Sequence, residues 1–109
     1  MSEVIKLCSV GDLEPDSARR LDVAGLRLAV VRIGDDWYAI ADRCSHADES
    51  LSDGDIWSEE REIECPKHGS TFSLLTGEPQ TLPATRKVPV YEVRVEGDDV
   101  MLVVPGEAL

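Results

Sequence analysis

Short apolar runs separated by Gly and Asp turns predict a protein built of β-strands. Residues 26–33 are rich in Val, Leu and Ile, residues 34–36 (Gly-Asp-Asp) interrupt them, and a second apolar run covers residues 37–41. Two apolar runs joined by so short a polar turn are typical of a β-hairpin. We therefore predict a hairpin in this first half of the chain.

A second hairpin is predicted near the C-terminus by the same order of residues. Residues 88–96 lead into residues 97–99 (Gly-Asp-Asp), and residues 100–104 return as an apolar run. Apolar and charged residues alternate over 91–96, which is the period of a strand with one face in water. Pro89 predicts an edge or bulged position, because proline cannot donate a hydrogen bond to a neighbouring strand.

The rest of the chain offers little evidence of helix. No window of 11 residues shows the 3.6-residue period of an amphipathic helix, and a short turn in residues 13–19 is the helical candidate. Cys8 falls in an expected N-terminal strand, where it is interpreted as a buried thiol. We predict an all-β fold in one domain, residues 1–109, whose antiparallel sandwich or barrel-like base comprises residues 1–42 and 87–109.

Residues 43–86 differ from this base because turn residues outnumber strand signals. Short strands are expected at residues 62–65 and 70–74, with Gly and Pro residues spread between and beyond them. We interpret the segment as a loop-rich subdomain inserted into the base. It has too little apolar content for a core of its own, and a bound metal would hold its loops together.

Four potential metal ligands lie in this segment as two pairs. Cys44 and His46 form a C-x-H pair, and 18 residues later Cys65 and His68 form a C-x2-H pair, which together use both histidines and two of the three cysteines of the chain. Thiolates and imidazoles bind soft or borderline transition metals. Structural zinc favours Cys pairs, whereas a Rieske [2Fe–2S] centre takes two Cys on one iron and two His on the other. We predict one such cluster per chain, with zinc as the alternative.

Further segments around these ligands resemble a known family. They are Trp37-Tyr38-Ala39-Ile40, Cys65-Pro66-Lys67-His68-Gly69-Ser70, Phe72, Thr76-Gly77-Glu78, Pro83-Ala84-Thr85 and Val88-Pro89-Val90-Tyr91. In this order they resemble the Rieske-type ferredoxins that serve bacterial aromatic-ring dioxygenases. The resemblance implies the Rieske fold, in which three small antiparallel sheets carry the cluster at the tip of the inserted cluster-binding subdomain. The 18-residue spacer is long for such a ferredoxin, and we expect the extra length around residues 53–60.

The resemblance also implies a function and partners. Such a protein is an electron carrier and not an enzyme. It takes electrons from a flavin-dependent, NAD(P)H-consuming reductase and passes them to a terminal Rieske oxygenase. An oxygenase subunit would need a further iron held by two His and a carboxylate, and both histidines here are already assigned. A non-catalytic accessory subunit of the nitrite-reductase type and a zinc-stabilised binding module remain as alternatives.

Three residues beside the ligands are expected to tune the cluster. Lys67 stands where respiratory Rieske proteins carry a disulfide-forming Cys, so that brace is absent. Ser70 matches a hydroxyl that hydrogen-bonds a bridging sulfide in high-potential relatives, and Phe72 stands where those relatives have a Tyr. A missing donor and nearby negative charge disfavour the reduced state. We predict a potential toward the low end of the roughly −150 to +300 mV Rieske range.

The net charge of the chain limits the classes of partner that it can bind. Twenty-two acidic and 11 basic residues give a net charge of −11, and residues 44–68 alone hold eight acidic and two basic residues. Such a chain does not suit nucleic acid or an anionic membrane, and no apolar run reaches the ~18 residues of a membrane span.

The acidic run is either a solvated face or a field that steers basic redox partners, and Trp57 within it either packs or contacts a partner. Three cysteines cannot all pair, so a disulfide framework is not expected and we predict a reducing, cytoplasmic compartment. We also expect the protein to be a monomer.

Overall fold

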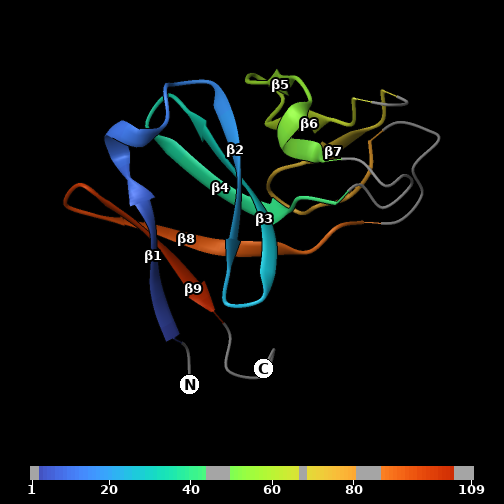
Figure 1. The fold of residues 1–109 in the computed structure, drawn as a ribbon. Helices are drawn as coiled ribbons and strands as arrows, with labels where there is room; N and C mark the ends of the chain where they lie inside the picture. The colour runs from blue at the N-terminus through green and yellow to red at the C-terminus, as the bar shows by residue number, and fades with distance from the viewer. Residues whose placement is uncertain (1–2, 44–49, 67–68, 81–86, 105–109) are drawn as a thin grey trace.

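The computed structural model describes residues 3–43, 50–66, 69–80 and 87–104 as two antiparallel sheets. The larger sheet has the strand order β1-β9-β8-β4-β3-β2 and the smaller one β5-β6-β7 (Figure 1). The strands are β1 Glu3–Ser9, β2 Ser17–Val23, β3 Leu26–Ile33, β4 Asp36–Ala41, β5 Ile56–Trp57, β6 Glu62–Glu64, β7 Thr71–Ser73, β8 Val90–Glu96 and β9 Asp99–Val104. Two short 3-10 helices, η1 Val10–Asp12 and η2 Leu51–Asp53, complete the described elements. The predicted all-β fold is confirmed, but the described residues form two antiparallel sheets and not the three that the resemblance implied, because the pairing of β4 with β8 joins the two hairpins into one sheet.

Both predicted hairpins are present. Strand β3 pairs with β4 up to Ile33 opposite Asp36, and β8 pairs with β9 up to Glu96 opposite Asp99. Strands β4 and β8 pair with each other and join the two hairpins into one sheet. The expectation for Pro89 was wrong: it lies directly before β8, which is an inner strand, and its carbonyl accepts a hydrogen bond from Ala41 N at 2.9 Å. A proline just ahead of a strand leaves that strand's hydrogen-bond ladder intact.

Residues 13–19 do not form the helical turn suggested by the sequence. The 3-10 helix η1 ends at Asp12, and β2 begins at Ser17 and pairs along its whole length with β3. Strand β2 lies at the edge of the large sheet and exposes Arg19 and Arg20. It therefore lacks the apolar alternation by which a strand is recognised.

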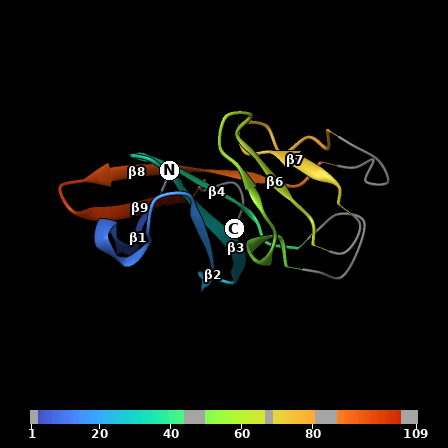
Figure 2. The same ribbon diagram turned by 90° about the horizontal axis from the view of Figure 1, so that it is seen from above.

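The core consists of two clusters on opposite faces of β3. Leu28 and Val30 contact one cluster, which includes Leu102 of β9. Ala29 and Val31 contact the other cluster, which continues into the small sheet. Because both faces of β3 are covered at its centre, residues 28–31 form a continuous apolar run. Figures 1 and 2 show the small sheet beside one end of the large sheet.

Within the described ranges, no helix is long and apolar enough to cross a membrane.

Candidate metal centre

Cys65 directly follows β6 and begins the second predicted ligand pair. The described residues at the two ends of a predicted ligand pair are called its root below. Its side chain is buried in the cluster shared by the two sheets. Its N–H donates to the carbonyl of Ser70 at 2.7 Å, and its own carbonyl accepts from the N–H of Gly69 at 3.0 Å. Gly69 has a φ of 73°, a conformation that favours glycine. These hydrogen bonds bring Cys65 close to residues 69–70, on the far side of Lys67 and His68, which lie outside the described residues.

The root of the first predicted ligand pair is likewise held by backbone contacts between the residues before it and the residues after it. Arg43 and Ser50 form an antiparallel bridge, and the N–H of Leu51 donates to the carbonyl of Asp42 at 2.6 Å. These contacts flank residues 44–49, which include Cys44 and His46 and lie outside the described residues. The structure thus defines the two ends of this segment.

The roots of the two ligand pairs lie side by side. Leu51 and Cys65 are fully buried in the same apolar cluster. Between them, the N–H of Glu64 donates to the carbonyl of Asp55 at 2.8 Å. Gly54 makes this approach sterically feasible, because a Cβ there would lie 1.6 Å from the carbonyl oxygen of Glu64. Chain segments that are far apart in sequence are thereby brought to one place.

Two of the three predicted tuning residues are described, and both are buried. Ser70 follows the tight turn, and Phe72 on β7 belongs to the same apolar cluster as Cys65. Phe72 also forms an isolated bridge with Pro79. The surroundings of Cys65 on this side are therefore apolar, apart from buried Ser70 and Thr71.

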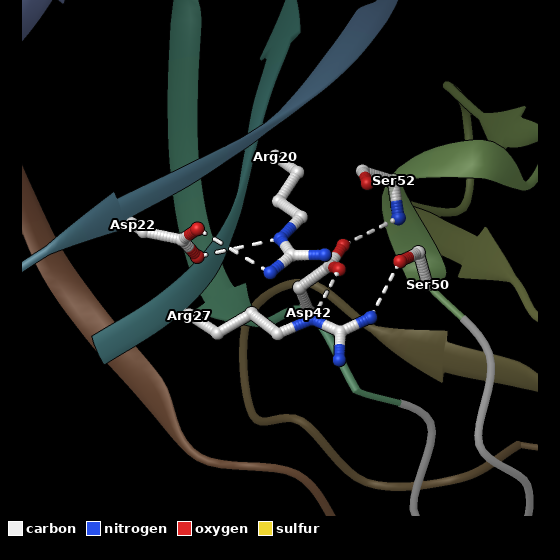
Figure 3. Close-up of polar contacts among 6 residues, drawn as sticks. All are labelled: Arg20, Asp22, Arg27, Asp42, Ser50 and Ser52. Atoms are coloured by element: carbon white, nitrogen blue, oxygen red, sulfur yellow. Dashed lines mark hydrogen bonds and ion pairs between the residues drawn. The ribbon is translucent and has the colours of Figure 1, made fainter. Parts of the chain in front are cut away.

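A buried carboxylate was missed by sequence reasoning. Asp42 has no exposed surface. Its Oδ2 accepts a hydrogen bond from Arg27 Nε at 3.0 Å, and its Oδ1 accepts one from the N–H of Ser52 at 2.9 Å (Figure 3). Arg27 Nη2 also donates to Ser50 Oγ at 2.6 Å. Burial acts to raise the pKa of Asp42, but hydrogen bonds from Ser52, Ser50 and Arg27 outweigh it and hold the pKa below its usual range. Asp42 therefore carries its negative charge at neutral pH.

An acidic groove lies beside the second ligand pair. It encloses about 260 Å³ and is lined by Trp57, Glu60, Glu62, Glu64, Gly69 and Thr71. Trp57 is 46% exposed, and its Nε1 donates to Glu64 Oε1 at 3.2 Å. This indole is not part of the core, so its apolar face is presented to solvent at the groove.

The donor set fits an iron–sulfur cluster better than a single hard cation. A pair of thiolates and a pair of imidazoles are the ligands of a Rieske centre, and Cys65 occupies the dry surroundings in which such centres are held. Within the described ranges alone, no three Cys, His, Asp or Glu residues gather as metal ligands. The fit therefore depends on the donor chemistry and on the convergence of the two roots.

Comparison with known proteins decides the family. The family model described as "Rieske [2Fe-2S] domain" matches residues 3–92. This chain belongs to that Rieske family. The 3-phenylpropionate/cinnamic acid dioxygenase ferredoxin subunit of Shigella boydii serotype 4 (strain Sb227) is 39% identical over 101 residues, which cover 93% of each chain.

Solved Rieske structures agree with this assignment. The ferredoxin of carbazole 1,9a-dioxygenase from Nocardioides aromaticivorans IC177 has a TM-score of 0.88 and 39% identity, over 94% of this chain and 97% of that one. A complex of reduced oxygenase and oxidized ferredoxin in carbazole 1,9a-dioxygenase contains a match with a TM-score of 0.83 and 39% identity, over 91% of each chain. The fold alone extends further. A putative NADH-dependent nitrite reductase small subunit from Mycobacterium tuberculosis has a TM-score of 0.86 at 18% identity, over 97% of this chain and 98% of that one.

These findings confirm the predicted resemblance, the Rieske fold and the cofactor type. The cofactor of the family is a Rieske-type [2Fe–2S] cluster. The chain is of the ferredoxin type, an electron-transfer component and not a catalytic subunit.

Proposed function

We propose that this Rieske protein is a one-electron carrier between a reductase and a terminal oxygenase. A flavin-dependent reductase that draws on NAD(P)H supplies the electron, and a Rieske oxygenase of an aromatic-ring dioxygenase system accepts it. Support comes from the 39% identity to dioxygenase ferredoxins over nearly the whole chain, and from the homologous ferredoxin that was solved together with its oxygenase. One cluster per chain, a monomer and a cytoplasmic location belong to the same proposal.

In this proposal the cluster is held by Cys44, His46, Cys65 and His68. Cys44 and Cys65 hold one iron through thiolates, and His46 and His68 hold the other through one ring nitrogen each. The observation that carries the assignment is the burial of Cys65 and Leu51 in one apolar cluster, to which the roots of both ligand pairs therefore contribute. When bound, the cluster gains and loses one electron.

The remaining residues near Cys65 control its surroundings. Phe72 contributes apolar surface and no hydrogen-bond donor, and Ser70 contributes a hydroxyl. Lys67 occupies the place at which a disulfide would brace the ligand loops in respiratory relatives. The unligated ring nitrogens of His46 and His68 remain for solvent or a partner.

Spectroscopy of the purified protein tests the ligand set. The protein should absorb visible light and give a reduced-state EPR signal, and Cys44→Ser and Cys65→Ser should abolish both. Cys8→Ser is the matched control, because Cys8 lies in β1 apart from the site and should leave the cluster intact. A colourless protein that binds zinc would contradict the assignment.

Titration of the potential tests the histidines separately. Oxidation of the cluster acidifies ligand imidazoles, so the reduction potential should fall as pH rises through their oxidised-state pKa values. A fall at alkaline pH would indicate ligated histidine, because unligated imidazole has a pKa of about 6.5 and does not titrate there. A potential that is flat from pH ~6 to ~11 would contradict histidine ligation.

A further inference from the structure

An ion pair between the buried carboxylate of Asp42 and the partly exposed Arg27 joins the two ends of the first ligand segment. Asp42 precedes the segment, Ser50 and Ser52 follow it, and Arg27 of β3 contacts both sides (Figure 3). Arg27 Nε donates to Asp42 Oδ2 at 3.0 Å, and its Nη2 donates to Ser50 Oγ at 2.6 Å. One guanidinium group therefore contacts both the residue before the segment and the residue after it.

Backbone hydrogen bonds reinforce the same connection. The N–H of Asp42 donates to the carbonyl of Arg27 at 3.0 Å, and the carbonyl of Asp42 accepts from the N–H of Leu51 at 2.6 Å. The Asp42 carboxylate also accepts from the N–H of Ser52 at 2.9 Å. Asp42 is thus connected to β3 on one side and to η2 on the other, through both its main chain and its side chain.

The cost of such an arrangement indicates a role beyond core packing. A carboxylate buried from water is unfavourable unless it is paired and hydrogen-bonded, and an apolar residue of similar size commonly stabilises a fold at least as well. Unlike an apolar residue, a paired carboxylate makes directional hydrogen bonds, which fix its donors at defined angles and distances. Here the donors belong to the two chain segments that flank residues 44–49.

We propose that Asp42, Arg27 and Ser50 are positioning residues, which clamp the ends of residues 43–50 and thereby set Cys44 and His46 for cluster binding. The inference rests on the proposed ligand set. Clamping the ends leaves less chain entropy to be lost when the segment binds the cluster. Residues that orient ligands in this way commonly alter metal affinity by roughly 10–100-fold when they are changed.

The test compares clamp variants with matched controls in the purified holoprotein. Asp42→Asn removes the charge but keeps an acceptor for the Ser52 N–H, and Ser50→Ala removes one hydroxyl without altering charge. The control for the first is Asp22→Asn, because Arg20 and Asp22 form an exposed ion pair at 3.3 Å (Figure 3). The control for the second is Ser58→Ala, whose Oγ makes an exposed hydrogen bond to Asp16 Oδ1 at 3.1 Å.

The measurements are the rate of bleaching in excess chelator, the reduced-state EPR spectrum and the thermal unfolding midpoint. Both clamp variants should lose their colour roughly tenfold faster than wild type and show shifted or broadened EPR lines. Both controls should match wild type. The EPR spectrum separates positioning from general stabilisation, since loss of fold stability alone lowers the midpoint without changing the lines.

Two results would count against the clamp in different ways. Clamp variants that bleach at the wild-type rate with a wild-type EPR spectrum would overturn the inference alone, even if their unfolding midpoints fell. A wild-type protein without visible colour or EPR signal would overturn the proposed ligand set and the clamp with it.

Discussion

The predicted low reduction potential depends chiefly on one side chain, Phe72. It is fully buried in the apolar cluster that contains Cys65 and brings no hydrogen-bond donor to it. Phe72→Tyr should raise the potential by a small fraction of the roughly 450 mV spanned by Rieske proteins, because a hydrogen-bond donor stabilises the more negative reduced state. Protein-film voltammetry measures the change. Phe72→Leu is the control, since it alters volume without adding a donor, and equal potentials for Tyr and Leu would contradict the argument.

Cys8 provides a prediction about pH that is independent of the cluster. Burial, and after it the negative charge of Asp12, raises the pKa of this thiol above 9.0. Because the folded-state pKa is the higher one, the resulting contribution to stability is complete below the unfolded pKa and is lost as pH rises through the folded pKa.

Alkylation of Cys8 by iodoacetamide at pH ~8.5 should therefore be at least several times slower in the folded protein than in urea, because the thiolate is the reactive form. Mass spectrometry of the Cys8 peptide measures the rate separately from the other cysteines. Equal rates in buffer and in urea would show that Cys8 is neither buried nor shifted.

At the scale of elements, Gly54 permits the contact between η2 and β6 that joins the two ligand roots. A Cβ at this position would overlap the carbonyl of Glu64, so the two segments would have to separate. Gly54→Ala should destabilise the protein by about 3 kcal/mol, near the upper end for single substitutions. Urea denaturation measures the loss. Gly11→Ala is the control, because a Cβ there meets nothing within 4 Å, and equal stabilities of the two variants would contradict the proposed contact.

The sequence predicted elements well where strands contribute apolar side chains to the core. The hairpins β3–β4 and β8–β9 were visible as apolar runs joined by Gly-Asp-Asp turns, and both are present. Strand β2 was not, because it lies at the sheet edge with its charged side chains in water. Strand β5 is only two residues long and gives no measurable period.

The sequence indicates candidate ligands more directly than it indicates the residues around them. Rare Cys and His residues in two short pairs indicate a metal on their own. Asp42 gave no such signal, because a charged residue next to a loop usually lies in water. Its partner Arg27 is 15 positions earlier in the chain, and only the pairing of β3 with β4 brings the two together.

At the scale of the whole molecule, acidic side chains lie both at the groove and far from it. Glu60 and Glu62 line the groove beside the second ligand pair, whereas Glu96 and Asp98 are exposed around the β8–β9 turn. Figure 1 shows this turn at the opposite side of the molecule from β5–β7. If the groove steers a basic redox partner, charge near it should matter more than equal charge at the turn.

Two charge-matched variants separate the effect of charge at the groove from the effect of charge at the β8–β9 turn. Glu60→Gln/Glu62→Gln should slow reduction by a ferredoxin reductase severalfold at low ionic strength, whereas Glu96→Gln/Asp98→Asn should have little effect. Stopped-flow measurements at increasing salt provide the second readout. The wild-type advantage should largely vanish above ~0.1 M, where the Debye length is about 10 Å. Both variants raise the net charge by two from −11, so equal slowing would mean that total charge, and not the groove, governs the encounter.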